Sequence, residues 1–189
     1  MYEKIFTFKF LPPGRGLWSM GTDITRKKNL FAALNNCAFV STGLNEVHND
    51  IIKPFLFMMD GAMLGVGIGF DTKGSKNNII IKKPDTNKTN LFVIPDSREG
   101  WVESLKLLLE TYFYENKPKV EFDYSKIRKA GSPLKIFGGV SAGAEPLKEL
   151  HRTIDLLLKE KENEKLSSRL IVDMMNIIGK CVIAGNIRK

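Results

Sequence analysis

The chain has 189 residues, of which 43% are hydrophobic, and it carries a formal net charge of +8 with a pI near 9.4. This length suits one domain with a real core, or a large piece of a bigger protein. Its apolar runs stay short of the roughly 18 residues of a membrane span, and its first residues do not follow the order of a secretory signal. With two cysteines the chain is no disulfide-dense secreted scaffold, so we expect a cytoplasmic location.

The excess positive charge suits a polyanion, either a nucleic acid or the phosphates of a nucleotide. The lysines are scattered, with local density at residues 73–88, 126–135 and 159–165. The sequence shows no basic stripe interleaved with aromatic residues, which single-stranded nucleic-acid binders use. We therefore expect mostly solvated lysines and no direct nucleic-acid binding.

The first 41 residues contain one clear strand signal. Residues 1–10 indicate the end of a helix or a short extended segment, which Pro12 and Pro13 terminate. Residues 36–41 contain Cys-Ala-Phe-Val, a continuous apolar run of strand length, and so predict a buried strand.

A helix and a polar excursion follow. Residues 46–64 have helical spacing with Asn45 as a plausible N-cap, and Pro54 indicates a kink or a later start. Residues 65–70 alternate glycine with apolar residues and indicate a strand or loop. Residues 71–90 are polar and lysine-rich and predict a surface excursion, such as a hairpin.

The next elements are a capped helix and a strand. The helix is predicted through residues 101–114, with Asp96 or Ser97 as its N-cap. Residues 119–124 alternate in polarity and predict a strand. Residues 126–143 are rich in glycine and small side chains and predict a loop.

The last third is helical. Residues 145–164 carry leucine and isoleucine on one stripe and predict an amphipathic helix, and residues 168–180 predict a second helix. Residues 181–184, Cys-Val-Ile-Ala, indicate the start of a further apolar strand.

The residues that carry chemistry are a thiol and three glycine-rich segments. Cys37 lies in the strand-like run, and its partner thiol is either Cys181 or missing from the chain. Glycine-rich segments at residues 14–21, 65–69 and 138–143 can expose backbone N–H groups to an anion, or can simply form tight turns. The spacing Gly-x-Gly-x-Gly at 65–69 is not a dinucleotide-binding fingerprint.

Neither histidine has the surroundings of a metal ligand. His48 lies near a predicted helix start, and His151 is placed on the polar side of its predicted helix. No second ligand stands at metal spacing from either, so we assign no metal site.

Six motifs occur in order along the chain. They are Pro-Pro-Gly-Arg-Gly-Leu-Trp, Leu-Asn-Asn-Cys, Gly-Val-Gly-Ile-Gly-Phe, Pro-Asp-Ser-Arg-Glu-Gly-Trp-Val, Gly-Gly-Val-Ser-Ala-Gly-Ala-Glu-Pro-Leu and Ile-Gly-Lys-Cys-Val-Ile-Ala-Gly-Asn-Ile-Arg. Together they resemble the adenosylcobalamin-dependent (class II) ribonucleoside-triphosphate reductases of the monomeric type. The resemblance covers residues 10–189.

The resemblance implies an α/β fold in which residues 1–189 form the incomplete N-terminal portion of a ten-stranded α/β barrel, with its first strands and helices only. It implies thiyl-radical reduction of ribonucleoside triphosphates to 2′-deoxyribonucleotides. Cys37 matches one member of the reducing cysteine pair of this family. Cys181 matches none of the essential cysteines, so we expect it to be a buried structural thiol.

The resemblance also implies residues that contact nucleotides. The substrate-binding candidates are Pro13, Gly14, Asn36, Gly67 and Gly69. The effector-binding candidates are Lys126, Arg128 and Arg188, for which ordinary surface charge is the alternative.

The implied cofactor is adenosylcobalamin, bound mainly by a part of the enzyme that this chain lacks. The implied partners are a ribonucleoside-triphosphate substrate, a deoxynucleotide effector, a thioredoxin-like reductant and a C-terminal reductase fragment that carries the radical cysteine. A split gene, an intein junction or a truncation would explain why that fragment is not part of this chain. Without the fragment we expect no activity and poor solubility. The rival hypothesis is a non-catalytic remnant that binds nucleotide or a partner reductase.

Overall fold

The computed structural model describes residues 2–11, 13–46, 48–133 and 140–184. The first elements in chain order are α1 (Tyr2–Phe6), α2 (Gly14–Ser19), α3 (Asp23–Arg26), η1 (Phe31–Leu34), β1 (Cys37–Val40), α4 (Lys53–Met63) and β2 (Gly67–Phe70). They are followed by η2 (Lys73–Asn77), β3 (Asp85–Val93), α5 (Arg98–Phe113), β4 (Pro118–Asp123), α6 (Glu145–Lys159) and α7 (Ser168–Ala184). None of the described helices is long and apolar enough to cross a membrane.

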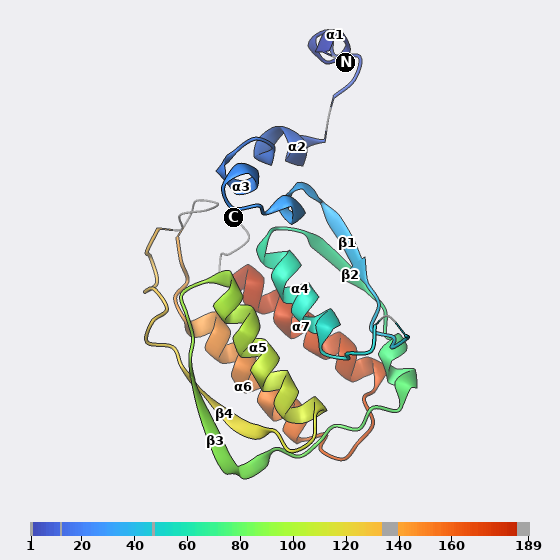
Figure 1. Ribbon diagram of the computed structural model, residues 1–189, viewed down its shortest axis with the longest axis vertical. Helices are drawn as coiled ribbons and strands as arrows, with labels where there is room; N and C mark the ends of the chain where they lie inside the picture. The colour runs from blue at the N-terminus through green and yellow to red at the C-terminus, as the bar shows by residue number, and fades with distance from the viewer. Residues whose placement is uncertain (1, 12, 47, 134–139, 185–189) are drawn as a thin grey trace.

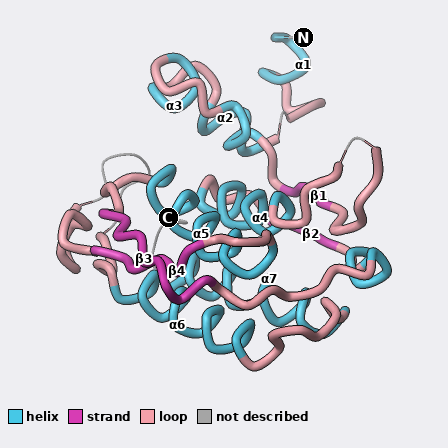
Figure 2. Tube along the Cα trace, turned by 60° about the horizontal axis from the view of Figure 1, so that its bottom comes forward, coloured by secondary structure: helices cyan, strands magenta, loops and turns pink. Residues whose placement is uncertain are grey.

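Four helices form the centre of the molecule. Helix α7 packs against α4 and α6, and α5 packs against the same two helices. The strands lie on opposite sides of this group, with β1 and β2 on one side and β3 and β4 on the other (Figure 1). The tube in Figure 2 shows the same separation from a second direction.

Each strand pair is a βαβ unit. Strands β1 and β2 are parallel and are joined through α4, while β3 and β4 are parallel and are joined through α5. A parallel pair needs such a crossover connection because its strands run in the same direction. The described residues form a mixed α/β structure with two separate two-stranded sheets, and these strands do not close a barrel.

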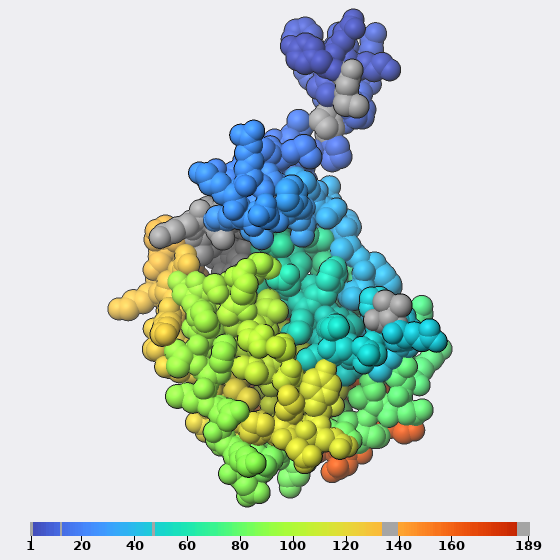
Figure 3. Space-filling model, in the orientation of Figure 1, coloured from blue at the N-terminus to red at the C-terminus, as the bar shows by residue number. Residues whose placement is uncertain are grey.

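The core lies among the helices. The side chains that are fully excluded from solvent include Phe55 and Met59 of α4, Leu105 and Leu109 of α5, Leu147 and Ile154 of α6, and Ile171 and Met174 of α7. Their helical spacing is the pattern that predicted α6 and α7 from the sequence. The residues before β1 contribute little to this core, and α1 has no buried residue. Figure 3 shows α1 standing apart from the main body.

Several sequence predictions are confirmed. Helix α4 carries Pro54 in its first turn, where the missing N–H costs no hydrogen bond, and it starts late, as the proline indicated. Helix α5 is capped by Ser97, whose Oγ accepts a hydrogen bond from the Gly100 N–H at 3.0 Å. Strand β4 lies within one residue of the predicted range, and the described residues of 126–143 form neither helix nor named strand.

Other predictions need correction. The predicted start at residue 46 with Asn45 as N-cap is wrong, because α4 begins at Lys53 after Ile52. The hairpin expected within residues 71–90 does not form: the segment holds η2 and the first part of β3, which pairs with β4, and Ile81 within it is fully buried. The strand expected at residues 181–184 is wrong, because α7 continues through Ala184 and buries Cys181. Helix α6 ends at Lys159, five residues earlier than predicted.

Candidate functional site

Cys37 is the first residue of β1 and is exposed. The sequence predicts a buried strand, but β1 is buried only on alternate residues: Ala38 and Val40 are partly buried, and Cys37 and Phe39 are exposed. In the register with β2, Cys37 pairs with Gly67 and Phe39 with Gly69. Because neighbouring residues in register share a face, these four residues line one sheet face, which we call the Cys37 face.

The two glycines of β2 add no side chains to the Cys37 face next to Cys37 and Phe39. Gly67 and Gly69 both have negative or extended backbone angles, since neither is among the positive-φ residues. A Cβ built on Gly67 would meet the Asn36 carbonyl at 3.6 Å, and one on Gly69 would meet Phe39 Cδ2 at 3.5 Å, which are ordinary contact distances. Neither backbone conformation nor internal packing therefore requires glycine at these two positions.

Arg15 ties the segment before β1 to this sheet. Its guanidinium donates to the carbonyl oxygens of Ala33 and Leu64, both at 3.2 Å, and to that of Gly65 at 2.5 Å. These acceptors immediately precede the two strands. Arg15 is not among the site residues predicted from the sequence, although an arginine between two glycines in the Pro-Pro-Gly-Arg-Gly motif is a usable signal. The guanidinium, with several donors in a fixed plane, suits three carbonyls from two segments.

The backbone conformation at residue 65 favours glycine. The φ of Gly65 is +81°, and this residue follows the C-cap of α4. The Gly65 N–H donates to the Ala62 carbonyl at 2.9 Å and the Val66 N–H to the Gly61 carbonyl at 3.0 Å. This is a Schellman arrangement, in which glycine supplies the left-handed residue that ends the helix. The turn delivers the chain into β2.

A second polar group holds the other end of the sheet. Asp71, directly after β2, accepts from the Thr42 N–H at 2.9 Å, the Ser41 hydroxyl at 2.8 Å and the Lys73 N–H at 3.2 Å. Partial burial raises the pKa of Asp71, but these hydrogen bonds outweigh burial and lower it to about 2. The carboxylate therefore stays ionised and fixes the segments that follow β1 and β2.

The predicted substrate residues gather around this sheet only in part. Asn36, Gly67 and Gly69 lie on or beside the Cys37 face, and the Gly67 N–H donates to the Asn36 carbonyl at 2.9 Å. Pro13 and Gly14 are exposed at the start of α2, next to Arg15. The Arg15 hydrogen bonds are the link between these two groups.

The predicted effector residues lie elsewhere. Lys126 is exposed after β4, in the segment on the opposite side of the molecule from β1 (Figures 1 and 2). Arg128 donates from Nε to Asp96 Oδ2 at 2.7 Å and from Nη1 to the Pro133 carbonyl at 3.3 Å. Its charge is therefore already balanced within the chain. Arg188 lies outside the described residues.

His151 does not lie on a polar surface as predicted. It is only 4% exposed, and its ring stacks on Phe122 with 4.2 Å between the ring centres. Ser104 Oγ lies 3.0 Å from Nε2 and Tyr124 Oη 2.8 Å from Nδ1. Since Ser104 donates to the Trp101 carbonyl at 2.7 Å, it accepts from Nε2–H, and Nδ1 accepts from the tyrosine.

Burial strongly changes the pKa of this histidine. It lowers the pKa of His151 to about 3, so the ring is neutral at physiological pH. Burial also raises the pKa of its partner Tyr124 to about 12. The ring of His151 on α6 is joined by hydrogen bonds to α5 and to Tyr124, the residue after β4, which is a structural role.

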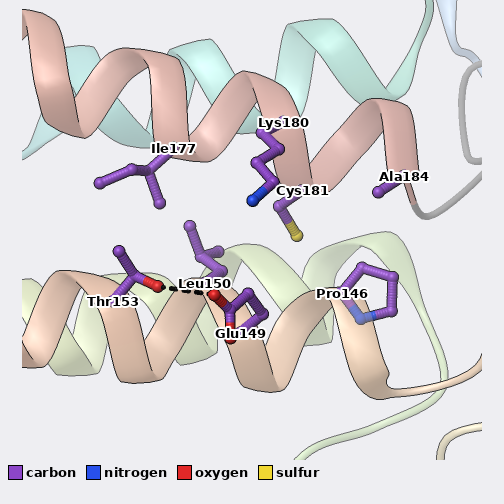
Figure 4. Close-up of a pocket in the computed structure, with 8 residues that line it drawn as sticks. All are labelled: Pro146, Glu149, Leu150, Thr153, Ile177, Lys180, Cys181 and Ala184. Carbon is purple, nitrogen blue, oxygen red and sulfur yellow. Dashed lines mark hydrogen bonds between the residues drawn. The ribbon is translucent and has the colours of Figure 1, made fainter.

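Cys181 is buried, whereas Cys37 is exposed. Cys181 is 3% exposed on α7, and burial raises the pKa of its thiol to about 12, which confirms the predicted buried thiol. Figure 4 shows it with Lys180 facing Pro146 and Glu149 of α6 across a cavity of about 90 Å³. Small-molecule sites are several times larger, roughly 300–1,000 Å³. Among the described residues, no group of three or more His, Cys, Asp or Glu side chains could hold a metal ion.

Comparison with known proteins adds three findings. The family model described as "B12-dependent ribonucleotide reductase, insertion domain" matches residues 72–158. The chain is 54% identical to the probable adenosylcobalamin-dependent ribonucleoside-triphosphate reductase of Dictyostelium discoideum and to the corresponding reductase of Euglena gracilis. Both alignments cover all of this chain but 26% of the relative, so the chain spans about a quarter of their length.

More distant relatives agree. The chain is 29% identical to the adenosylcobalamin-dependent ribonucleoside-triphosphate reductase of Lactobacillus leichmannii, covering 32% of that protein. A crystal structure of a B12-dependent (class II) ribonucleotide reductase superposes with a TM-score of 0.81 at 27% identity, over 97% of this chain and 32% of the other. The arrangement of helices and strands described above is therefore found within a much longer protein.

Proposed function

Since the chain is a homologue of part of the adenosylcobalamin-dependent, class II ribonucleoside-triphosphate reductases, we propose that it supplies the Cys37 side of the active site of such a reductase. In this proposal β1 and β2 are the first strands of the family's ten-stranded barrel. The catalytic centre is completed by the regions of such a reductase that these 189 residues do not span, which carry the radical cysteine. The observation that carries the proposal is the exposed Cys37 thiol on a sheet face with bare glycine beside it.

The chemistry proposed for Cys37 is a two-electron reduction. Replacing the 2′ hydroxyl of a ribonucleotide by hydrogen consumes two electrons and two protons and releases water. Cys37 and a second thiol, contributed by a region of the reductase that this chain does not span, supply both and are oxidised to a disulfide. An exposed thiol suits this role because it must reach the sugar and later meet a thioredoxin-like reductant.

The sheet supports Cys37 from both ends. Arg15 holds the residues that precede β1 and β2, and Asp71 holds the residues that follow them. A reacting group needs such fixed surroundings because small displacements slow a reaction strongly. Asn36, Gly67 and Gly69 are the proposed contacts to the ribonucleoside triphosphate, with Pro13 and Gly14 at the margin of the site.

Adenosylcobalamin supplies the radical that starts the reaction in this family. The cavity between α6 and α7, at about 90 Å³, is far too small for a corrinoid. We propose that adenosylcobalamin is bound mainly by the regions of the reductase that this chain does not span. A deoxynucleotide effector is proposed near Lys126, Arg128 and Arg188, where Arg128 would have to exchange Asp96 for a phosphate.

A chimaera tests the proposal. The alignment with the Euglena gracilis reductase covers all 189 residues, so this chain can replace the matching region of that enzyme. With adenosylcobalamin, ATP and thioredoxin as reductant, we expect deoxynucleotide formation that is lost on Cys37→Ser and kept on Cys181→Ser, the matched buried control. Turnover that survives Cys37→Ser would remove the redox role.

The chain by itself provides a second test. Because Cys37 is exposed and Cys181 is buried, N-ethylmaleimide should modify Cys37 first, and ribonucleoside triphosphates should slow that reaction. Protection without turnover in the chimaera would favour the non-catalytic nucleotide-binding remnant. Absence of both protection and turnover would contradict the proposed function.

A further inference from the structure

Phe39 is a large apolar side chain in an unusual place. It lies two residues after Cys37 on the same strand face and is 64% exposed. Its neighbours Ala38 and Val40 point to the other face and are partly buried. The Cys37 thiol and the Phe39 ring thus lie on the exposed face of β1, opposite the face on which Ala38 and Val40 are partly buried.

The spacing of the two side chains matches a nucleotide. Successive residues of a strand rise about 3.3 Å, so positions two apart on one face are separated by roughly 6.6 Å. In the proposed reaction the ribose C2′ lies against the Cys37 thiol. The base is attached to the adjacent ring carbon, C1′, and so extends from C2′ by a comparable distance. A base directed along β1 would meet the Phe39 ring.

The neighbouring strand places no side chain beside that ring. The register partner of Phe39 is Gly69, and a Cβ there would lie in ordinary contact with Phe39 Cδ2, at 3.5 Å. The chain itself thus tolerates a side chain at residue 69. Glycine keeps the surface next to the ring at the level of the backbone.

We propose that Phe39 is a positioning residue whose ring forms the platform for the substrate's nucleobase and so holds the ribose over Cys37. The inference rests on the proposed function and adds to it a residue that recognises the base. Every nucleobase has a flat π face, so the ring contributes affinity for all four ribonucleoside triphosphates and does not choose among them.

The test uses protection of Cys37 from N-ethylmaleimide in the full chain. Alanine substitution at a base-stacking residue weakens nucleotide binding about fivefold to a hundredfold. Phe39→Ala should therefore raise the half-protecting concentration of ATP, GTP, CTP and UTP at least about fivefold. Phe39→Tyr should restore it, since a tyrosine ring also stacks. Phe31→Ala is the matched control, because Phe31 is 58% exposed on η1.

Inorganic triphosphate separates a base platform from a general effect on the fold. It has no base, so any protection that it gives should be equal in the native chain and in Phe39→Ala. In the chimaera, Phe39→Ala should raise KM more than it lowers kcat, and Phe39→Tyr should reverse the change.

The outcomes distinguish the inference from the proposed function. If ATP protects Cys37 in the native chain and the half-protecting concentration is the same in Phe39→Ala, the platform is overturned and the Cys37 site stays intact. An equal loss of protection by inorganic triphosphate would also overturn it, because the substitution would then have disturbed the sheet. If no nucleotide protects Cys37 in the native chain and the chimaera is also inactive, the proposed function is overturned, and the platform with it.

Discussion

Replacing His151 by Gln should flatten the pH dependence of the chain's stability below pH 7. In the structure the neutral ring donates from Nε2 to Ser104 and accepts at Nδ1 from Tyr124, while it stacks on Phe122. Protonation would place a charge in this buried site and would remove the acceptor that the tyrosine uses. The folded state therefore resists a proton that the unfolded chain accepts.

The size of the effect follows from the two pKa values of His151, about 3 in the folded chain and 6.5 in the unfolded reference. Because the folded value is the lower one, the unfolded state binds more protons between these values, and stability falls as the pH falls through 6.5. Each pH unit well inside this interval costs about 1.4 kcal/mol. Between pH 8 and pH 5 the expected loss is about 2 kcal/mol.

Urea unfolding at pH 8, 7, 6 and 5 measures this loss directly. His151→Gln keeps one donor and one acceptor but does not titrate, so its curve should lack the loss of about 2 kcal/mol, although its stability at pH 8 should be lower. The control is His48→Gln, because His48 is the second histidine and is exposed. An unchanged pH slope in His151→Gln, or a slope that disappears in His48→Gln, would refute the reasoning.

Three further substitutions, with Gly179→Ala as a control, test other contacts by urea unfolding at pH 7, and Asp71→Asn is also measured in acid. Arg15→Ala removes the three bonds to backbone carbonyls and should cost about 2 kcal/mol; an unchanged midpoint would show that these bonds do not hold the sheet. Asp71→Asn should cost about 2 kcal/mol, because a pKa lowered from 3.8 to about 2 stabilises the fold above pH 3.8 and is lost as the pH falls through 2; the variant should lack that acid-dependent loss. Gly100→Ala should destabilise by about 1–3 kcal/mol, since its Cβ would lie 2.5 Å from the Pro95 carbonyl oxygen. In Gly179→Ala within α7 the added Cβ would lie 3.3 Å from Met58 Cε, the movable end of a flexible side chain, so stability should change by less than about 1 kcal/mol.

Local signals located much of the fold. Ser97 as the cap of α5 and Pro54 in the first turn of α4 are residues whose own chemistry marks a helix start. The leucine stripe of α6 and the alternation of β4 are equally local. Such elements can be predicted because the signal and the structure lie in the same few residues.

The errors come from contacts that are distant in sequence. Residues 85–93 begin Asp-Thr-Asn-Lys-Thr-Asn and have little β-propensity, yet they form β3 because β4 pairs with them. Residues 181–184 include Cys, Val and Ile, which favour strands, but packing of α7 against α4 and α6 keeps them helical. Tertiary contacts decide such segments.

His151 is a different case, because the sequence contained the information. On a helix of 3.6 residues per turn, position 151 lies one turn after Leu147 and beside Leu150 and Ile154. It therefore falls within the apolar stripe, and its assignment to the polar side followed residue type in place of position. A titratable residue inside an apolar stripe is best predicted as buried and hydrogen-bonded.

The candidate site lies where the simple pattern failed. Cys-Ala-Phe-Val predicts a strand buried on both faces because all four residues are apolar. In the structure Ala38 and Val40 follow that rule, while Cys37 and Phe39 are exposed opposite bare glycine. Folding of the described chain gains nothing from an aromatic ring and a thiol on an open face. Such residues are expected where another molecule completes the surface, and this is the physical reason for assigning the nucleotide to the Cys37 face.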